Sequence, residues 1–271
     1  MFDLRCIELI TDYNKAVLEG DFDRLKQIKE ILYPPKLYRY RTFDPHWYSN
    51  IIKGKVYLNS PVNFNDPFDG NLYGYASIFY NGLLNANGEL PPDDFKIMNT
   101  NGEIKNFTEI LKKRQIGFKD CFRVACFSEK FDLMTMWAHY AANHSGYVIE
   151  YDTTKMTTKQ KNKLYKIAYF SKEELKNVDF VPLRKPIFNL LQKDIEWAYE
   201  QEWRMVETRD ADTYEDLTEC ISAIYLGIDF KKQHYQDELE AIQEHFFKTG
   251  AKLYEMDVSN AGDALKPKTL L

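Results

Sequence analysis

The chain has 271 residues, of which 44% are hydrophobic and 15% aromatic, and its formal net charge is −5. This length and composition suffice for a folded domain with a sizeable core and argue against a disordered chain. The acidic balance argues against a general nucleic-acid binder, although it permits a local basic groove.

The cysteines and the N-terminus bear on cofactor and compartment. Four widely spaced cysteines, without a Cys-x-x-Cys pair or a histidine at ligand spacing, argue against a disulfide framework and against zinc. The N-terminus lacks a signal-peptide pattern, and no apolar run reaches membrane-spanning length. We therefore expect a cytoplasmic protein without membrane contact.

Hydrophobic periodicity predicts an α+β fold in two parts. Helical spacing on both sides of Gly20, ended by Pro34-Pro35, predicts an N-terminal helical hairpin over 1–35. The rest, 36–271, is predicted to be a single α+β domain, a curved mixed β-sheet with flanking helices. Strands are expected at 36–41, 55–59, 124–127, 146–151, 165–170, 200–206 and 221–226, with an edge strand at 252–257. Helices are expected at 45–53, 134–143, 157–163, 186–198 and 237–249.

The stretch from 81 to 119 stands apart because it is polar and thin in apolar residues. It contains one helical segment, near 107–114. We predict that it forms an excursion or lid on the domain.

The most informative segment runs from Tyr199 to Val206, where charged and large apolar residues alternate. A period of two is typical of a strand, and it places Glu200, Glu202 and Arg204 on one face. Burying unpaired charge is costly. These three side chains therefore form a structural ion network or line a cleft that binds a ligand.

A second charged strand is predicted from Leu37 to Arg41. It places Arg39 and Arg41 on one face and two tyrosines, Tyr38 and Tyr40, on the other. The arginines are either solvated on an edge strand or form an anion site, since guanidinium groups grip phosphate or carboxylate with two bonds.

Other polar candidates lie in a turn and on a helix. In the segment Asn63–Gly70, Asp66 and Asp69 are expected to cap turns, although they are also candidate metal ligands or bases; without a second carboxylate cluster, no metal is predicted. His139 falls off the stripe of Trp137 and Tyr140, which makes it a candidate to face a cleft. The sequence contains no nucleophile elbow, Walker loop, dinucleotide fingerprint or zinc-protease motif.

Several short segments together resemble a known family. They resemble, in order and from about residue 36 to 230, the bacterial domain-of-unknown-function 2971 family, which carries no assigned activity. The segments are Leu37–Arg41, Val56–Pro61, Phe64–Asp69, Cys126–Ser128, Met136–Tyr140, Gly146–Glu150 and Tyr199–Arg204.

A looser resemblance is to ADP-ribosyltransferase-like domains. An opening strand with tyrosine and arginine, then a helix with Ile51-Ile52-Lys53-Gly54 and another strand, is similar to the start of such domains, and Glu200-Gln201-Glu202 is similar to their Glu-x-Glu element. No Ser-Thr-Ser triplet is present.

The resemblance implies NAD as substrate and a role for each candidate residue. Glu202 would stabilise the oxocarbenium-like transition state and hold the ribose 2′-hydroxyl, and Glu200 would orient or deprotonate an unknown protein or nucleic-acid acceptor. Arg39 or Arg41 would hold the pyrophosphate and Tyr40 would stack on nicotinamide. Ser60 would supply a supporting hydroxyl.

Three functions stay open. The first is this NAD-dependent transferase, which a groove flanked by Arg39 and Glu202 would favour. The second is a non-enzymatic sensor or interaction module, for example in phage defence, which a closed ion network without a pocket would favour. The third is a metal-dependent hydrolase or nuclease that uses Asp66, Asp69, His139 and Glu202.

A test of the first function follows from Glu202. A closed, buried pair of Glu202 with Arg204 would count against catalysis by Glu202. If Glu202 is catalytic, Glu202→Gln should abolish transfer and leave thermal stability nearly unchanged.

Overall fold

The computed structural model describes residues 4–70, 96–98, 104–176, 186–233, 236–262 and 264–270. Within these ranges one mixed sheet has the strand order β14-β13-β12-β6-β1-β5-β10-β7, and only β12 and β13 run parallel to each other. Its strands are β1 (Lys36–Arg41), β5 (Phe122–Ser128), β6 (Tyr147–Asp152), β7 (Leu164–Lys166), β10 (Glu202–Thr208), β12 (Ile221–Leu226), β13 (Lys252–Val258) and β14 (Leu265–Thr269). The predicted α+β class with a mixed sheet is confirmed.

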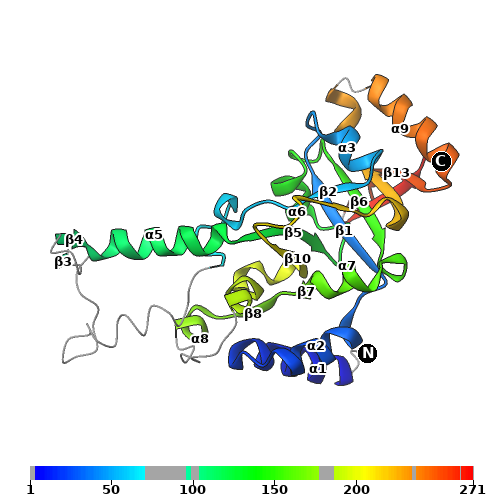
Figure 1. Ribbon diagram of the computed structural model, residues 1–271. Helices are drawn as coiled ribbons and strands as arrows, with labels where there is room; N and C mark the ends of the chain where they lie inside the picture. Colours follow the sequence, from blue (N-terminus) through cyan, green and yellow to red (C-terminus); the bar gives the residue numbers. More distant parts are fainter. Residues whose placement is uncertain are drawn as a thin grey trace.

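The remaining described elements surround this sheet (Figure 1). The helices are α1 (Leu4–Glu19), α2 (Phe22–Leu32), α3 (Trp47–Ile51), α5 (Phe107–Asp120), α6 (Met134–Tyr140), α7 (Thr158–Lys163), α8 (Lys172–Lys176) and α9 (Gln236–Thr249). Short 3-10 turns are η1 (Pro61–Asn63), η2 (Thr153–Lys155), η3 (Pro186–Leu191), η4 (Ile195–Glu200), η5 (Thr218–Cys220) and η6 (Phe230–Gln233). Three two-stranded pairs are β2 (Lys55–Tyr57) with β11 (Tyr214–Asp216), β3 (Lys96–Met98) with β4 (Ile104–Asn106), and β8 (Ala168–Phe170) with β9 (Gln192–Asp194). None of the described helices is long and apolar enough to cross a membrane.

The two faces of the sheet carry different cores because side chains alternate along each strand. One face packs against α3, β2 and α9, around residues such as Ile149, Trp203 and Phe246. The opposite face packs against α6 around Trp137, and against the hairpin α1–α2 and η3 around Phe188. Figure 1 shows the hairpin lying along the end of the sheet that carries β7. The two clusters on this second face flank the candidate site.

The predicted N-terminal hairpin is present and is bound to the sheet by polar contacts. Asp21 caps α2 by accepting a hydrogen bond from the Arg24 backbone N–H. The buried ammonium of Lys29 donates to the backbone oxygens of Lys161 and Asn162, at 3.2 Å each, and lies 4.1 Å from the ring centre of Tyr165. The hairpin therefore shares a core with the sheet, and a domain boundary at residue 35 stays a prediction.

Lys29 makes the stability depend on pH. Burial lowers the pKa of Lys29 to about 8, from the usual 10.5. Between these values the unfolded chain binds the proton and the folded chain does not, so the free energy of unfolding contributed by Lys29 rises with pH. Relative to Lys29→Met, the wild type should gain about 2–3 kcal/mol between about pH 7 and pH 10 in urea denaturation.

The matched control for this effect is Lys15→Met, which removes an exposed lysine from the other helix of the hairpin. It should leave the pH dependence of the wild type in place. A difference between wild type and Lys29→Met that stays constant over this range would contradict the assignment to Lys29.

Three predicted elements are wrong. The expected helix at 186–198 is two 3-10 turns, η3 and η4, with β9 between them, because Gln192 and Lys193 pair with β8. The expected strand at 165–170 is divided between β7 and β8, which lie in different sheets. The expected edge strand at 252–257 is an inner strand, since β14 pairs with β13.

The predicted polar excursion at 81–119 lies partly outside the described residues. Its described parts are β3, β4 and α5, and α5 is longer than the predicted helical stretch. Figure 1 shows α5 extending away from the sheet. A role as a lid stays a prediction.

Candidate functional site

Strand register places Glu202 and Arg204 on the same face of the sheet as Tyr38, whereas Arg39 and Arg41 alternate onto the opposite face. Tyr38 pairs with Ser128, and Ser128 pairs with Glu202, so a row crosses β1, β5 and β10. Two residues further along β10, and on the same face, Arg204 lies opposite Cys126 of β5. The predicted shared face of Glu202 and Arg204 is therefore observed.

Glu200 reaches the same site by a route that alternation did not predict. The strand β10 begins at Glu202, and Gln201 before it has a left-handed backbone, with φ of 45°. Glu200 is thus the last residue of the turn η4 rather than a strand residue. The Ser128 hydroxyl donates to the Glu200 backbone oxygen at 2.7 Å, which attaches this turn to β5.

Arg204 is the centre of a closed ion network. It is fully buried and its Nε and Nη2 donate to the two oxygens of Glu202, at 2.7 and 2.9 Å. Nη1 and Nη2 donate to the two oxygens of Asp69, at 2.8 and 2.5 Å, and Nη1 also donates to the Leu190 oxygen. All five N–H donors of the guanidinium are used. By the criterion set above, this geometry counts against catalysis by Glu202.

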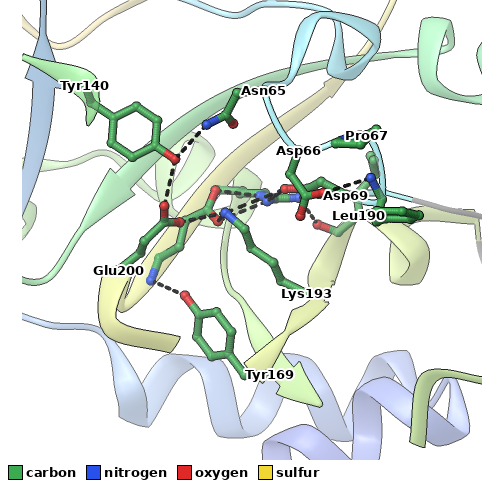
Figure 2. Close-up of polar contacts among 12 residues, drawn as sticks. Asn65, Asp66, Pro67, Asp69, Tyr140, Tyr169, Leu190, Lys193 and Glu200 are labelled. Carbon is green, nitrogen blue, oxygen red and sulfur yellow. Dashed lines mark hydrogen bonds and ion pairs between the residues drawn. The ribbon is translucent and has the colours of Figure 1, made fainter. Parts of the chain in front are cut away.

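Lys193 links the same carboxylates from β9. Its ammonium is buried, 2.6 Å from Glu200 Oε2, 3.1 Å from Glu202 Oε2 and 3.7 Å from Asp69 Oδ2. The Tyr140 hydroxyl donates to Glu200 Oε1 at 2.7 Å and accepts from the Asn65 amide at 3.2 Å. Figure 2 shows Tyr140 and Lys193 both directed at Glu200.

The two glutamates have opposite electrostatic surroundings. Burial and the Glu202 carboxylate raise the pKa of Glu200, although Lys193 opposes this. Burial alone would raise the pKa of Glu202, but Arg204 and Lys193 lower that pKa to about 2. Burial would likewise lower the pKa of Lys193, but the carboxylates of Glu202, Asp69 and Glu200 raise it. Glu202 is therefore a fixed anion, whereas Glu200 is the better proton acceptor.

A cavity of about 330 Å³ opens beside this network. Glu200, Glu202, Lys193 and Arg204 line it on the β10 side. Its other lining residues come from β1, β5, α6 and the loop after β2: Tyr38, Arg39, Tyr40, Arg41, Asn59, Asn63, Phe64, Asn65, Asp69, Val124, Cys126, Phe127, Ser128, Met136 and Tyr140. Strands β1 and β5 pair at one position only, Tyr38 with Ser128, so they separate beyond it and leave room for the cavity.

Arg39 forms the β1 side of the cavity and differs from Arg204 in its partners. It is 8% exposed, and its one hydrogen bond runs from Nη2 to the Tyr57 oxygen at 2.9 Å. Within the described part of the chain, no carboxylate lies at ion-pair distance from it. Burial and the neighbouring Arg41 lower the pKa of Arg39. Arg41 pairs with Asp44 at 3.2 Å, and its buried Nε has no hydrogen-bond partner.

The other predicted ligand residues divide between cavity and surroundings. Tyr40 lines the cavity, but its hydroxyl donates to the Lys130 oxygen and its ring packs edge-on against Trp137. Ser60 is not among the lining residues, because its hydroxyl caps η1 by accepting from the Val62 N–H. His139 is exposed on α6 and is also outside the lining.

Lys193, Tyr140 and Asn59 are among the lining residues that the sequence did not single out as site residues. Lys193 had been expected on a helix, and nothing in its neighbourhood signals a buried ammonium. Tyr140 carried a signal, since it belongs to the Met136–Tyr140 segment, but helical periodicity assigned it to the core stripe.

The donor set does not fit the metal-dependent alternative. Asp66 caps a turn by accepting from the Phe68 N–H, and Asp69 and Glu202 are both bound to Arg204. Guanidinium and ammonium groups thus occupy the carboxylate oxygens that a divalent ion would need. Across the described residues, no group of three or more histidine, cysteine, aspartate or glutamate side chains is placed to hold a metal. Burial raises the pKa of the Cys126 thiol, which disfavours a thiolate nucleophile.

Comparison with known proteins gives a family for the segment that carries most of this network. Residues 136–205 match the family model described as protein of unknown function (DUF2971). Over these residues the chain is similar to this family. The match is shorter than the resemblance predicted from the sequence, and it includes Tyr140, Lys193, Glu200, Glu202 and Arg204. Arg39 and Asp69 lie outside the matched residues. Neither a curated protein nor a solved structure matches the chain.

Proposed function

We propose that this protein binds a phosphate-bearing nucleotide in the cavity between β1 and β10, with NAD as the first candidate. The observation that carries the proposal is Arg39, a guanidinium more than nine-tenths buried that lines the cavity and makes a single hydrogen bond to protein. Burying a charge without a counter-ion is costly unless a ligand supplies one. A phosphate group fits the fork of N–H donors that Arg39 leaves open.

The other walls of the cavity suit the remainder of a nucleotide. Tyr40, Phe64 and Tyr140 supply aromatic surface, and Asn63 and Asn65 supply amides. A cavity with mixed aromatic and polar walls and a volume of about 330 Å³ lies at the lower end of the size range of small-molecule sites.

The test is calorimetric titration of the purified protein with NAD and with ADP. Arg39→Ala should weaken binding about 10- to 100-fold, because a charge-assisted hydrogen bond contributes about 1.5–3 kcal/mol. The control is Arg209→Ala, which removes an arginine whose side chain is 55% exposed and which does not line the cavity. Equal affinities of Arg39→Ala and wild type would remove Arg39 from the site, and no binding to the wild type would refute the proposal.

A second candidate is ADP-ribosyl transfer from bound NAD with Glu200, rather than Glu202, as the reacting carboxylate. The observation that favours it is the pKa of Glu200, which burial raises while the side chain still faces the cavity. In this reaction the bond between nicotinamide and ribose breaks and nicotinamide leaves. The acceptor then bonds to the ribose carbon and gives its proton to Glu200.

The sensor or interaction module is the second function that the sequence left open. The closed network of Asp69, Lys193, Glu202 and Arg204 meets one half of its criterion, but the cavity beside the network does not meet the other half, the absence of a pocket. Nucleotide binding without turnover would be consistent with such a module. A link to phage defence stays a hypothesis that rests on no observation in the structure.

A further inference from the structure

The cavity has a cationic end and an acidic end. The two ends differ because the cations at the β10 end are neutralised by carboxylates of the protein, whereas Arg39 at the β1 end is not. Arg204 uses all five of its N–H donors on Glu202, Asp69 and Leu190. Lys193 lies within 4 Å of three carboxylates. Arg204 therefore has no donor left for a ligand phosphate, and the charge of Lys193, which donates to Glu200 and Glu202, is already balanced by these carboxylates. Arg39, on β1, makes one hydrogen bond to protein, so a phosphate group is expected at the β1 end.

The β10 end is acidic by a simple charge count. Three carboxylates, of Asp69, Glu200 and Glu202, face two cations, Lys193 and Arg204, which leaves a formal excess of one negative charge. Glu200 is the one of these carboxylates that Arg204 does not bind. Oε1 accepts a hydrogen bond from Tyr140 and Oε2 accepts one from Lys193, and a carboxylate oxygen has two lone pairs. Glu200 can therefore accept further hydrogen bonds from a ligand in the cavity.

The distance between the two ends limits the size of that ligand. β5 lies between β1 and β10 in the sheet, so the backbones of β1 and β10 are about 10 Å apart at Tyr38, where β1 pairs with β5, and farther apart beyond it. The space between them has aromatic side chains on its walls, among them Tyr40, Phe64 and Tyr140. This length and the volume of about 330 Å³ suit one nucleotide unit, with its base between aromatic side chains.

We propose that the cavity selects a nucleotide unit whose base carries a hydrogen-bond donor, with the phosphate on Arg39 and an exocyclic amino or carboxamide group on Glu200. This selectivity rests on the proposed nucleotide binding and adds a substrate class to it. A base with an oxygen at that position presents lone pairs to the carboxylate and is rejected, because two acceptors then face each other without a proton between them.

The test compares pairs of ligands in which an oxygen-bearing group replaces the amino or carboxamide group. Calorimetric titrations use AMP against IMP, CMP against UMP, and nicotinamide mononucleotide against nicotinic acid mononucleotide. At least one pair should bind, and the member with the amino or carboxamide group should bind about tenfold more tightly or better. Glu200→Gln, whose side-chain amide both donates and accepts, should reduce this ratio towards one. The control Glu196→Gln, an exposed glutamate of the same turn η4, should preserve the ratio.

The outcomes separate this inference from the proposed function. Equal affinity within every pair that binds, or tighter binding of the oxygen-bearing member, would overturn the selectivity and leave nucleotide binding standing. Absence of binding by all six ligands and by NAD would overturn both. Because the ligand pairs are compared on the wild type, the result does not depend on the folding of Glu200→Gln.

Discussion

Arg204→Met is expected to lower the free energy of unfolding by about 3–5 kcal/mol, a large share of the stability of a typical domain. The arginine is fully buried, and its removal leaves Asp69 and Glu202 in the core with Lys193 as their nearest common cation. Removing one partner of a buried pair costs more than the pair contributes, since the remaining charges keep their desolvation penalty. The loop that carries Asp69 would also lose its attachment to β10.

Urea denaturation followed by circular dichroism measures this loss. Arg209→Met is the matched control, because the side chain of Arg209 is half exposed and its ion pair with Asp120 lies at the surface. The control should change stability by less than about 0.5 kcal/mol. A loss below about 1 kcal/mol for Arg204→Met would mean that the network does not hold the fold together.

Glu202→Gln is expected to destabilise the protein by about 3 kcal/mol, which differs from the sequence-based expectation of nearly unchanged stability. Glu202 is 3% exposed, and both of its oxygens accept from Arg204. An amide in its place puts a donor against a guanidinium and an ammonium. Glu207→Gln, on the same strand with a partly exposed pair to Lys163, is the control and should cost far less.

Variants of Glu200 and Glu202 distinguish a catalytic role from a structural one. If the cavity transfers ADP-ribose, release of nicotinamide from NAD should be lost in Glu200→Gln while the affinity for NAD changes by less than about tenfold. In Glu202→Gln, nicotinamide release should fall only in proportion to the fraction of the protein that is unfolded. Nicotinamide release that survives in Glu200→Gln but disappears in folded Glu202→Gln would return the catalytic role to Glu202. The readout is chromatography of NAD and nicotinamide at a temperature where both variants are folded.

Local patterns in the sequence predicted much of the secondary structure. The range of β1 was predicted from its alternation, and Gly20 with Pro34-Pro35 marked the hairpin. The prediction failed from 186 to 198, where residues with an apparent helical spacing form two 3-10 turns and β9. The pairing of β9 with β8 is a contact between segments distant in sequence, so no periodicity within either segment reveals it.

The chemistry of the site was predicted in part. Alternation placed Glu202 and Arg204 on one face. A charged strand suggested Arg39 as an anion ligand; Arg39 lines the cavity, and its role as a ligand stays a prediction. Ser60 and His139 were selected by type and position, yet one caps η1 and the other is exposed on α6. The type of a residue indicates which chemistry its side chain can perform. Where that side chain points depends on turns and helix ends, which the pattern of single residues does not specify.

The sequence by itself determined the α+β class, the N-terminal pair of helices and the alternation of charged side chains on two strands. It also pointed to the DUF2971 family. Only the tertiary structure decided which carboxylates are neutralised. Lys193 and Asp69 reach Glu202 and Arg204 from other parts of the chain, and the low-dielectric interior makes each such neighbour decisive for charge. Ionisation depends on distances in space, and those distances follow from strand order and packing rather than from spacing along the chain.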